Sequence, residues 1–541
     1  MELYRINEIE LLGSYKNTWN HILEVNQNTN PFIEFQWIEN WWRYLGKTLN
    51  VEILIVEKDE AIIAFCPFIF NRMRNTTLIE FLGHGEANYM DFIVYDKERE
   101  VSIQFVFEEM MKLEPKCVFN LHGLLSSSPS MNIISSVLAK KGIEPSIFPV
   151  ITPYINLENI NLSAYLKKRR KIHGLDRREK RLSNLGEVKV RIIDPREIEY
   201  VFTLHDKHWS RKQDTSQFTS NDHKKFYTSL LNIHDVPLQA IVEGLYLDDQ
   251  MIAFSYGFLC RGRFLGYIIG HDDDFGLYGP GTILDKELIA NSESKSITIF
   301  DLSIGYEPYK FEWNTDVDYT NNIVFSTNDW QTKFTFNVLK YKNRFKEILK
   351  MNYKIVLFKR EFLGQIVYFL KNASLTDWVE SLIKIRSRLY SSRTINIFKQ
   401  SVDLNEGSEY FPQTFYQVRN IQSNLPQVNK RFYNGFLPYS DTSNSLFWVQ
   451  SKIIRVDEVG YLKPLAKQSV FLLEWEIHKL SKISSYLRQN NEIKDIFIHL
   501  DARDKHLIQP LKQLGFIHAN SISKTCFLFK TSTNVINLVK L

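Results

Sequence analysis

Residues 238–271 read LQAIVEGLYLDDQMIAFSYGFLCRGRFLGYIIGH and indicate the fold class together with residues 278–302. Its apolar runs predict three strands, Leu238–Tyr246, Met251–Cys260 and Arg263–His271, the first two joined by a turn at Asp248-Asp249. The sequence YGPGT (278–282) then opens a predicted helix that runs to about Ala290, and SITIFDL (296–302) predicts the next strand. Strand, turn, strand, strand, loop, helix and strand follow one another, which indicates an α+β fold.

The residues before this stretch predict another α+β block with a mostly antiparallel sheet. Large apolar residues recur at helical spacing from Phe35 to Leu45. Two apolar runs then flank the acidic turn Glu57–Glu60, which is typical of a hairpin. A strand at Thr77–Leu82, a helix over 101–113 and a strand at Cys117–Leu121 complete the block.

A chain of 541 residues is too long for one hydrophobic core and predicts about three domains. We expect an N-terminal domain over 1–152, a second domain over 153–330, a basic helical connector over 331–400 and a C-terminal domain over 401–541. The second domain opens with a basic helix over roughly 161–185. The third contains strands near 446–456, 470–477 and 495–500, with helices near 480–489 and 506–514.

Composition is typical of a globular protein, with 44% apolar residues, 24% charged residues and a net charge of +5. Four cysteines stand far apart without a CxxC pair, which argues against a disulfide framework and a zinc site. Cys66, Cys117 and Cys260 are expected to be buried in strands. The N-terminus shows no apolar signal region, so we expect a cytoplasmic protein, with peripheral attachment to the inner face of a membrane as the alternative.

Several ordered motifs in residues 30–315 resemble one acetyltransferase family. They are Asn30-Pro31-Phe32 with Trp41-Trp42, Ala64-Phe65-Cys66-Pro67-Phe68, Phe81-Leu82-Gly83 with Asn88-Tyr89-Met90-Asp91, Arg181–Gly186, His205 with Trp209 and Arg211, Gly279-Pro280-Gly281, Asp301-Leu302-Ser303-Ile304-Gly305, and Glu307–Trp313. The chain is thereby similar to the CelD-like acetyltransferases of cellulose biosynthesis, within the GNAT superfamily and related to the FemABX transferases. The resemblance implies tandem GNAT-like domains with mixed, mostly antiparallel sheets flanked by helices, and acetyl-CoA or another acyl-CoA as donor.

The third block resembles a lone C-terminal half of a GNAT domain. Ile496–Leu500 and Leu511-Lys512-Gln513-Leu514-Gly515-Phe516 carry this likeness. The junction Trp475–Leu480 has no glycine, whereas the family's pyrophosphate loop is Gly-rich there. We therefore expect a degenerate third GNAT-like domain.

Gly279, Gly281 and Thr282 are the candidate donor-binding residues. Exposed N–H groups at a helix start suit a pyrophosphate, and glycine lets the backbone approach the anion. The alternative is an ordinary helix start with proline in its first turn.

Asp301, Tyr309 and Lys310 are the candidate catalytic residues. Asp301 ends a buried strand, where a raised pKa would suit a general base, and the alternative is a cap on the following loop. By the resemblance, Tyr309 would protonate the leaving thiolate. Lys310 would stabilise the oxyanion or hold a donor phosphate. The alternative for Tyr309 is packing under the sheet.

His208 is a second candidate base, with Trp209 and Arg211 on the same helix as candidate substrate-binding residues. The alternative places Trp209 in the core and the others in solvent. Asn88, Tyr89 and Asp91 are candidate acceptor-binding residues, and ordinary turn chemistry is their alternative. No ligand spacing such as HExxH occurs, so we predict no catalytic metal.

Residues 167–181 carry nine basic side chains against two acidic ones, Asp176 and Glu179. This stretch could bind an anionic membrane surface, a tRNA or an acidic carrier, or it could be a solvated face. Stacking aromatics typical of RNA-binding motifs are missing, and no DNA partner is expected.

The leading hypothesis is an acyltransferase that moves an acyl group from acyl-CoA to a sugar, amino-sugar or envelope precursor by direct attack in a ternary complex. One alternative is a FemX-type transferase with an aminoacyl-tRNA donor, to which the basic helix would point. The other is a non-catalytic glycan-binding or assembly protein built on degenerate folds.

Overall fold

The computed structural model divides the chain into two compact units. It describes residues 1–73, 75–210, 218, 220–234, 237–351, 390–401, 409–442, 445–491, 493–527 and 530–537. Unit 1 comprises Met1–Arg177, Val188–Asp273 and Gly279–Tyr368, and unit 2 comprises Arg178–Glu187, Asp274–Tyr278 and Phe369–Leu541. Both units combine helices with large mixed sheets, so the α+β class is confirmed.

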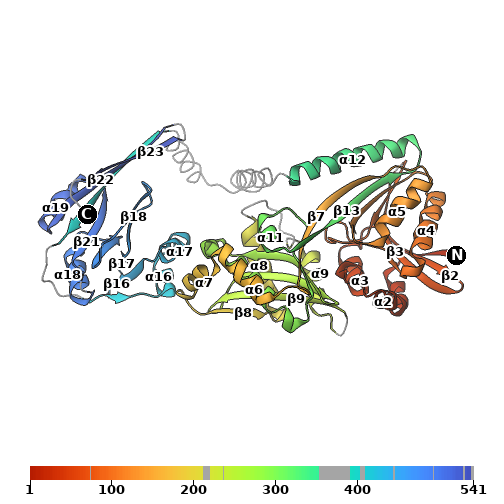
Figure 1. Cartoon of the computed structure of the whole chain (residues 1–541), viewed down its shortest axis with the longest axis horizontal. Helices are drawn as coiled ribbons and strands as arrows, with labels where there is room; N and C mark the ends of the chain where they lie inside the picture. The colour runs from red at the N-terminus through yellow and green to blue at the C-terminus, as the bar shows by residue number, and fades with distance from the viewer. Residues whose placement is uncertain are drawn as a thin grey trace. The chain divides into compact units, whose positions relative to one another are not determined.

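One 13-stranded sheet runs through unit 1, in the order β1-β2-β3-β4-β6-β13-β7-β12-β11-β10-β9-β8, with β5 paired to β3 (Figure 1). Its strands are β1 (Glu2–Ile6), β2 (Val51–Lys58), β3 (Ala61–Arg72), β4 (Thr77–Phe81), β5 (Ile93–Val94), β6 (Cys117–Leu125), β7 (Ser146–Asn156), β8 (Val188–Ile192), β9 (Leu238–Leu247), β10 (Gln250–Cys260), β11 (Arg263–His271), β12 (Ile299–Asp301) and β13 (Asp316–Ser326). From the edge strand β1 to β6, the strands of the first half lie in chain order, and from the other edge strand β8 to β12 those of the second half do so too. Strands β13 and β7 lie between them at the centre.

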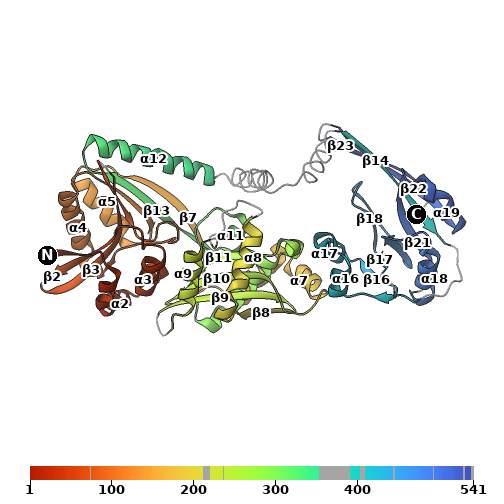
Figure 2. The same ribbon diagram turned by 180° about the vertical axis from the view of Figure 1, so that it is seen from behind.

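Helices accompany both halves of this sheet. They are α1 (Ile9–Leu12), α2 (Lys16–Val25), α3 (Phe35–Tyr44), α4 (Arg99–Leu113), α5 (Pro129–Lys140), α6 (Leu162–His173), α7 (Leu175–Ser183), α8 (Ile198–Ser210), α9 (Asn221–Leu231), α10 (Pro280–Ala290), α11 (Pro308–Trp313) and α12 (Trp330–Met351). Helix α3 of the first half lies against α9 of the second, as Figure 2 also shows from behind. The two halves thus share helix contacts as well as a sheet.

The two halves exchange strands at the centre of the sheet. Strand β7, which ends the first half of the chain, pairs with β12, whereas β13, which ends the second half, pairs with β6. β7 and β13 also pair with each other from Asp316↔Tyr154 to Val324↔Ser146. The predicted boundary at residue 152 therefore falls inside β7, in a strand that joins the halves.

Each half contains one pair of neighbouring parallel strands. In the first half β4 pairs with β6 from Thr77↔Cys117 to Glu80↔Asn120, and in the second β11 pairs with β12 from Arg263↔Ile299 to Leu265↔Asp301. In neither pair are further residues of the two strands paired beyond these positions. Each half can therefore open at the point where its parallel pair ends.

The opening of the first half is filled by the chain itself. The N–H of Met90 donates to the carbonyl of Gly123, with 2.9 Å between nitrogen and oxygen. Gly123 has φ of +84°, and a Cβ there would lie 2.7 Å from the Met90 nitrogen. Only glycine allows this close approach. The segment Glu86–Asp91 therefore occupies the first opening.

An aromatic core supports this arrangement, with Trp19, Trp37, Phe32, Phe65 and Tyr89 almost completely buried. Phe119 of β6 stacks on Phe325 of β13, with ring centroids 4.6 Å apart. Cys66, Cys117 and Cys260 are buried in strands, as predicted.

Unit 2 is built on its own eight-stranded sheet, in the order β15-β16-β17-β20-β21-β14-β22-β23. Its strands are β14 (Tyr390–Gln400), β15 (Phe411–Pro412), β16 (Leu437–Ser440), β17 (Leu446–Gln450), β20 (Ser469–Leu473), β21 (Asp495–Asp501), β22 (Phe516–Phe527) and β23 (Lys530–Asn537), beside the separate pair β18 (Ile453–Val456) and β19 (Tyr461–Pro464). Its further helices are α16 (Phe415–Ile421), α17 (Leu425–Tyr433), α18 (Leu480–Asn491) and α19 (Ile508–Gln513). β20 and β21 are parallel neighbours, like the parallel pairs of unit 1.

The predicted strands β9, β10, β11 and β21 and the helices α10 and α18 are confirmed within a few residues. Three predictions differ. The predicted strand near 446–456 is two strands, β17 and β18, which belong to separate sheets. The basic helix is two helices, α6 and α7, because Gly174 between them has φ of +59°. The predicted helical connector ends in strand β14, which belongs to the unit 2 sheet, while residues 352–389 of the connector lie outside the described residues.

We expect Gly123→Ala to lower the free energy of unfolding by about 3 kcal/mol, because a Cβ clashes with Met90 and the backbone is left-handed. Gly142→Ala is the matched control, since Gly142 also has positive φ (+65°) but has open space around its Cβ position. It should cost about 1 kcal/mol. Urea unfolding measures both values, and equal losses would contradict the close approach at Gly123.

Candidate functional site

The opening of the second half of unit 1 is a cavity of about 320 Å³. It lies where β11 and β12 stop pairing, between Gly266–Ile269 on one side and Leu302–Ile304 on the other. Glu307, Tyr309 and Lys310 at α11, His205 of α8, and Gly85 and Asn88 of the first half complete its lining. Both halves therefore contribute to one cavity.

Asp301 precedes the lining residues Leu302–Ile304 and is itself fully buried. Its Oδ1 accepts hydrogen bonds from the Tyr89 hydroxyl at 3.0 Å and from the Ser303 N–H at 2.7 Å. Its Oδ2 accepts two from the Arg263 guanidinium, at 2.9 and 2.5 Å. Burial raises the pKa of the Tyr89 phenol well above its usual value, with the Asp301 carboxylate adding to the effect, so this hydroxyl remains a donor.

These four bonds define what Asp301 can do. Both oxygens are occupied, and Arg263 supplies the counter-charge that a buried carboxylate requires. The sequence offered Asp301 as either a general base or a cap on the following loop. The bond to the Ser303 N–H is such a cap, and the remaining three bonds occupy both carboxylate oxygens.

Tyr309 and Lys310 both line the cavity, as their predicted roles require. Lys310 is 5% exposed, and its ammonium donates to the Ile304 carbonyl at 2.5 Å and pairs with Glu307 at 3.1 Å. An ammonium has three N–H groups, so one remains for a ligand. Burial, with the nearby Asp285 and Glu307 carboxylates, raises the pKa of Tyr309 well above its usual value. Tyr309 therefore keeps its proton at neutral pH.

Asp285 of α10 is a titratable group that the sequence did not single out. Burial raises the pKa of its carboxyl from 3.8 to about 7. Asp285 does not line the cavity, but its carboxylate adds to the raised pKa of Tyr309, which does. A carboxyl that titrates near neutrality beside a cavity residue is a candidate for proton transfer. In the sequence, Asp285 is one of three consecutive charged residues, Asp285-Lys286-Glu287, and nothing distinguishes it from its neighbours.

Gly279, Gly281 and Thr282 lie at the start of α10, as predicted, and do not line the cavity. Gly279 has φ of +67°, which glycine adopts without strain. A Cβ at Gly281 would meet only the His271 Nδ1, at 4.0 Å, so the space in front of this helix start is open. Since His271 ends β11, the helix start and the cavity share one strand.

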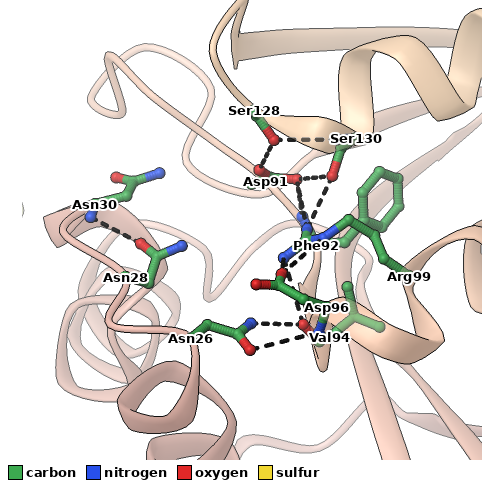
Figure 3. A network of polar contacts seen from close by, with 10 residues as sticks. All are labelled: Asn26, Asn28, Asn30, Asp91, Phe92, Val94, Asp96, Arg99, Ser128 and Ser130. Atoms are coloured by element: carbon green, nitrogen blue, oxygen red, sulfur yellow. Dashed lines mark hydrogen bonds and ion pairs between the residues drawn. The ribbon is translucent and has the colours of Figure 1, made fainter.

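The predicted acceptor residues Asn88, Tyr89 and Asp91 lie at two different cavities. Asn88 lines the cavity and donates to the Ser303 hydroxyl at 2.8 Å. Asp91 instead lines a second cavity, of about 240 Å³. Figure 3 shows Asp91 accepting from the hydroxyls of Ser128 and Ser130, both at 2.5 Å. Tyr89 lines the second cavity and contributes its hydroxyl to the Asp301 network between them.

The second cavity is strongly polar. Arg99 is 4% exposed, donates to Asp96 at 2.7 Å and to Ser130 at 2.9 Å, and lies 3.6 Å from Asp91 (Figure 3). The loop Asn26–Asn30 forms the other wall. Amides, hydroxyls and carboxylates of this kind suit a ligand with several hydroxyl groups.

The remaining predicted residues are placed only in part. The side chains of His208 and Trp209 and the whole of Arg211 lie outside the described residues. On the same helix, His205 is 4% exposed and lines the first cavity, with its ring 4.7 Å from Phe218. Among the described residues, no group of three or more His, Cys, Asp or Glu is arranged to hold a metal.

The basic stretch 167–181 is partly engaged within the protein. Arg169 donates to the carbonyl of Asn314 at 2.9 Å, and Arg170 pairs with Asp176 at 2.5 Å. Lys167 and Lys168 remain exposed.

The comparison with known families bears on the region that holds the cavity. Residues 167–311 match the family model of the acetyltransferase (GNAT) domain. This region is similar to a GNAT domain. The match supports acyltransferase activity in general, and acyl-CoA is the donor that GNAT domains use. No curated protein matches the chain.

Solved structures with a similar backbone arrangement include three proteins. FemX shares 10% identity, with 59% of this chain and 97% of FemX covered and a TM-score of 0.42. A tandem GNAT protein from the clavulanic acid biosynthesis pathway shares 10%, with 61% and 99% covered and a TM-score of 0.38. A GCN5-related N-acetyltransferase from Sphaerobacter thermophilus shares 11%, with 60% and 96% covered and a TM-score of 0.29.

We expect Asp301→Asn to lower the free energy of unfolding by about 3–5 kcal/mol, because it leaves the buried Arg263 charge without a partner. Tyr89→Phe removes a single hydrogen bond to the same carboxylate and should cost about 1–2 kcal/mol. Urea unfolding of both variants at neutral pH measures the difference. A loss at Asp301→Asn no larger than at Tyr89→Phe would contradict a charge-paired, buried Asp301.

Proposed function

We propose that this protein is an acyl-CoA-dependent N- or O-acyltransferase that acts on a sugar, amino-sugar or envelope precursor of the exopolysaccharide type. One observation carries the proposal: the cavity between the diverging strands β11 and β12 is lined mainly by residues of 167–311, the region similar to a GNAT domain. The equivalent opening of the first half is filled by Met90. The donor is therefore assigned to the second half.

The donor would lie along the end of β11. Backbone groups of Gly266–Ile269 no longer paired with β12 line the cavity and can bind amide groups of an extended donor. The start of α10 would take the pyrophosphate, because its N–H groups and the helix dipole favour an anion and Gly281 leaves space there. CoA carries both kinds of group.

Transfer would proceed by direct attack of an acceptor amine or hydroxyl on the thioester carbonyl, with the thiolate leaving. The third N–H of Lys310 would stabilise the developing oxyanion, and Tyr309 would protonate the thiolate. For the acceptor proton we propose Asp285 in place of Asp301, since burial raises the pKa of Asp285 to about 7 and its charge acts on the cavity residue Tyr309. Asp301 instead positions Tyr89 and Ser303, and through Ser303 also Asn88.

The acceptor would approach from the first half of unit 1. Asn88 is the first-half side chain that reaches the donor cavity and carries an amide. Its neighbours Tyr89 and Asp91 face the polar second cavity, whose amides and hydroxyls fit a sugar. A sugar-bearing acceptor is therefore the class that these side chains favour.

An aminoacyl-tRNA donor is the second candidate, favoured by the exposed Lys167 and Lys168. Binding that falls steeply with salt would distinguish it from CoA, since phosphate contacts release counterions.

We expect acetyl-CoA or a longer acyl-CoA to raise the melting temperature saturably. At a hundredfold excess over the dissociation constant, the stabilisation is about 2.7 kcal/mol. Gly266→Trp should abolish the shift, because an indole there fills the cavity. Gly13→Trp is the control, since Gly13 is exposed and has nothing within 4 Å of its Cβ position. Thermal shift with CoA, acyl-CoAs and charged tRNA measures it, and no shift with any acyl-CoA overturns the donor assignment.

We expect the transfer rate to rise with pH up to about 7 and then level off, because Asp285 accepts a proton only when ionised. Asp285→Asn should lower the rate by about a hundredfold and remove this limb of the profile. The same raised pKa means that the folded state holds a proton that the unfolded state has lost. Stability should therefore fall between about pH 4 and 7 in the wild type, and less so in Asp285→Asn. An unchanged rate and pH profile in the variant would remove Asp285 from the mechanism.

A further inference from the structure

Helix α12 presents a continuous stripe of large apolar side chains to the solvent. Its members are Trp330 (74% exposed), Phe334 (69%), Val338 (49%), Tyr341 (67%), Phe345 (63%) and Ile348 (56%). They recur every three or four residues, so they share one face of the helix over five turns. A contiguous exposed apolar surface of this length on a globular unit marks an interaction site.

The opposite face of α12 holds the helix in place on unit 1. Phe336 and Leu339 pack against Val118, Phe148 and Val324 of the central sheet. Thr332 is fully buried and donates to the Thr327 carbonyl at 2.7 Å. Figure 1 shows α12 alongside β7 and β13. The sheet contacts therefore fix the helix with its apolar stripe outward.

Basic side chains border this stripe. Residues 330–351 contain six basic residues and one acidic residue, Glu347. At 100° per residue, Lys333, Lys340 and Arg344 fall on one side of the stripe. Lys342 and Lys346 fall on the other. An apolar stripe with positive charge along both edges is complementary to a surface that is apolar inside and anionic outside.

We propose that α12 docks unit 1 on the surface of an anionic lipid bilayer, with its axis in the plane of the membrane. Apolar and aromatic side chains of such a helix enter the boundary between headgroups and acyl chains, while lysines and arginines contact the anionic headgroups. Trp330 and Tyr341 are residues that favour this boundary. No described helix is long and apolar enough to cross a membrane, so α12 lies on the bilayer.

A second copy of the chain fits this face less well. Phe334, Val338, Tyr341, Phe345 and Ile348 have the spacing of a coiled-coil seam, but such seams favour Leu, Ile and Val over aromatic residues. Lys342 and Arg344 beside the seam would place like charges next to those of a partner helix. The same charges attract anionic lipid.

The test is flotation of the full-length protein with vesicles of phosphatidylcholine alone, or with phosphatidylglycerol added. We expect binding only when phosphatidylglycerol is present, and weakening at high salt. Phe334→Glu/Phe345→Glu should reduce binding at least about tenfold, because two charges then face the acyl chains. Val101→Glu/Leu113→Glu is the matched control, with exposed apolar residues on α4 of the same unit. It should bind like the wild type. Circular dichroism shows whether each variant is folded.

Three results would overturn the proposal. These are no preference for anionic vesicles, unchanged binding by the folded Phe334→Glu/Phe345→Glu variant, or a dimer in light scattering that this variant dissociates while the wild type ignores vesicles. The last result would assign the stripe to a second copy. Acyl-CoA thermal shifts on the same samples report the donor site separately, so failure of one proposal does not disguise failure of the other.

Discussion

The antiparallel pairing of β7 with β13 joins the two halves of unit 1 into one sheet. Each strand leaves its own half of the chain and pairs in the other, so neither half has a complete sheet without its partner. The exchange brings the first-half segment Glu86–Asp91 within hydrogen-bonding distance of residues after β12, as the Asn88–Ser303 bond shows. A cavity that needs side chains from both halves depends on this pairing.

The same segment makes the two halves unequal. Met90, bonded to Gly123, fills the opening of the first half. Asn88, two residues earlier, lines the cavity of about 320 Å³ in the opening of the second half. Glu86 takes part as well, since its carbonyl accepts from the Tyr267 hydroxyl on β11 at 2.5 Å. Of the two openings beside the parallel strand pairs, the one in the first half is therefore filled by the chain, and the first half contributes a wall to the other. This asymmetry favours a single donor site in unit 1.

Local sequence patterns predicted the strands β9 to β11 and helix α10 because alternation, turn residues and helix starts are local signals. The strand exchange could not be predicted, since apolar alternation does not say which strands pair. The motif around Asp301 lies beside the cavity of the second half. The hydrogen bonds that occupy the Asp301 carboxylate could not be predicted, because Tyr89 lies 212 residues away and Arg263 lies on another strand. The sequence did not indicate a role for Asp285. Its raised pKa comes from burial in the folded protein, which the residues of the helix alone do not reveal.

The state of Asp301 constrains what chemistry the site can perform. The Asp301 carboxylate accepts four hydrogen bonds, two of them from a buried guanidinium, so both of its oxygens are occupied. Asp285 has the opposite environment, since burial without a counter-charge raises its pKa toward neutrality. The two carboxyls therefore stand in different electrostatic environments, because Asp301 has an arginine partner whereas burial alone raises the pKa of Asp285. Under the proposed mechanism, this difference is why Asp301 would position neighbouring groups and Asp285 would exchange protons.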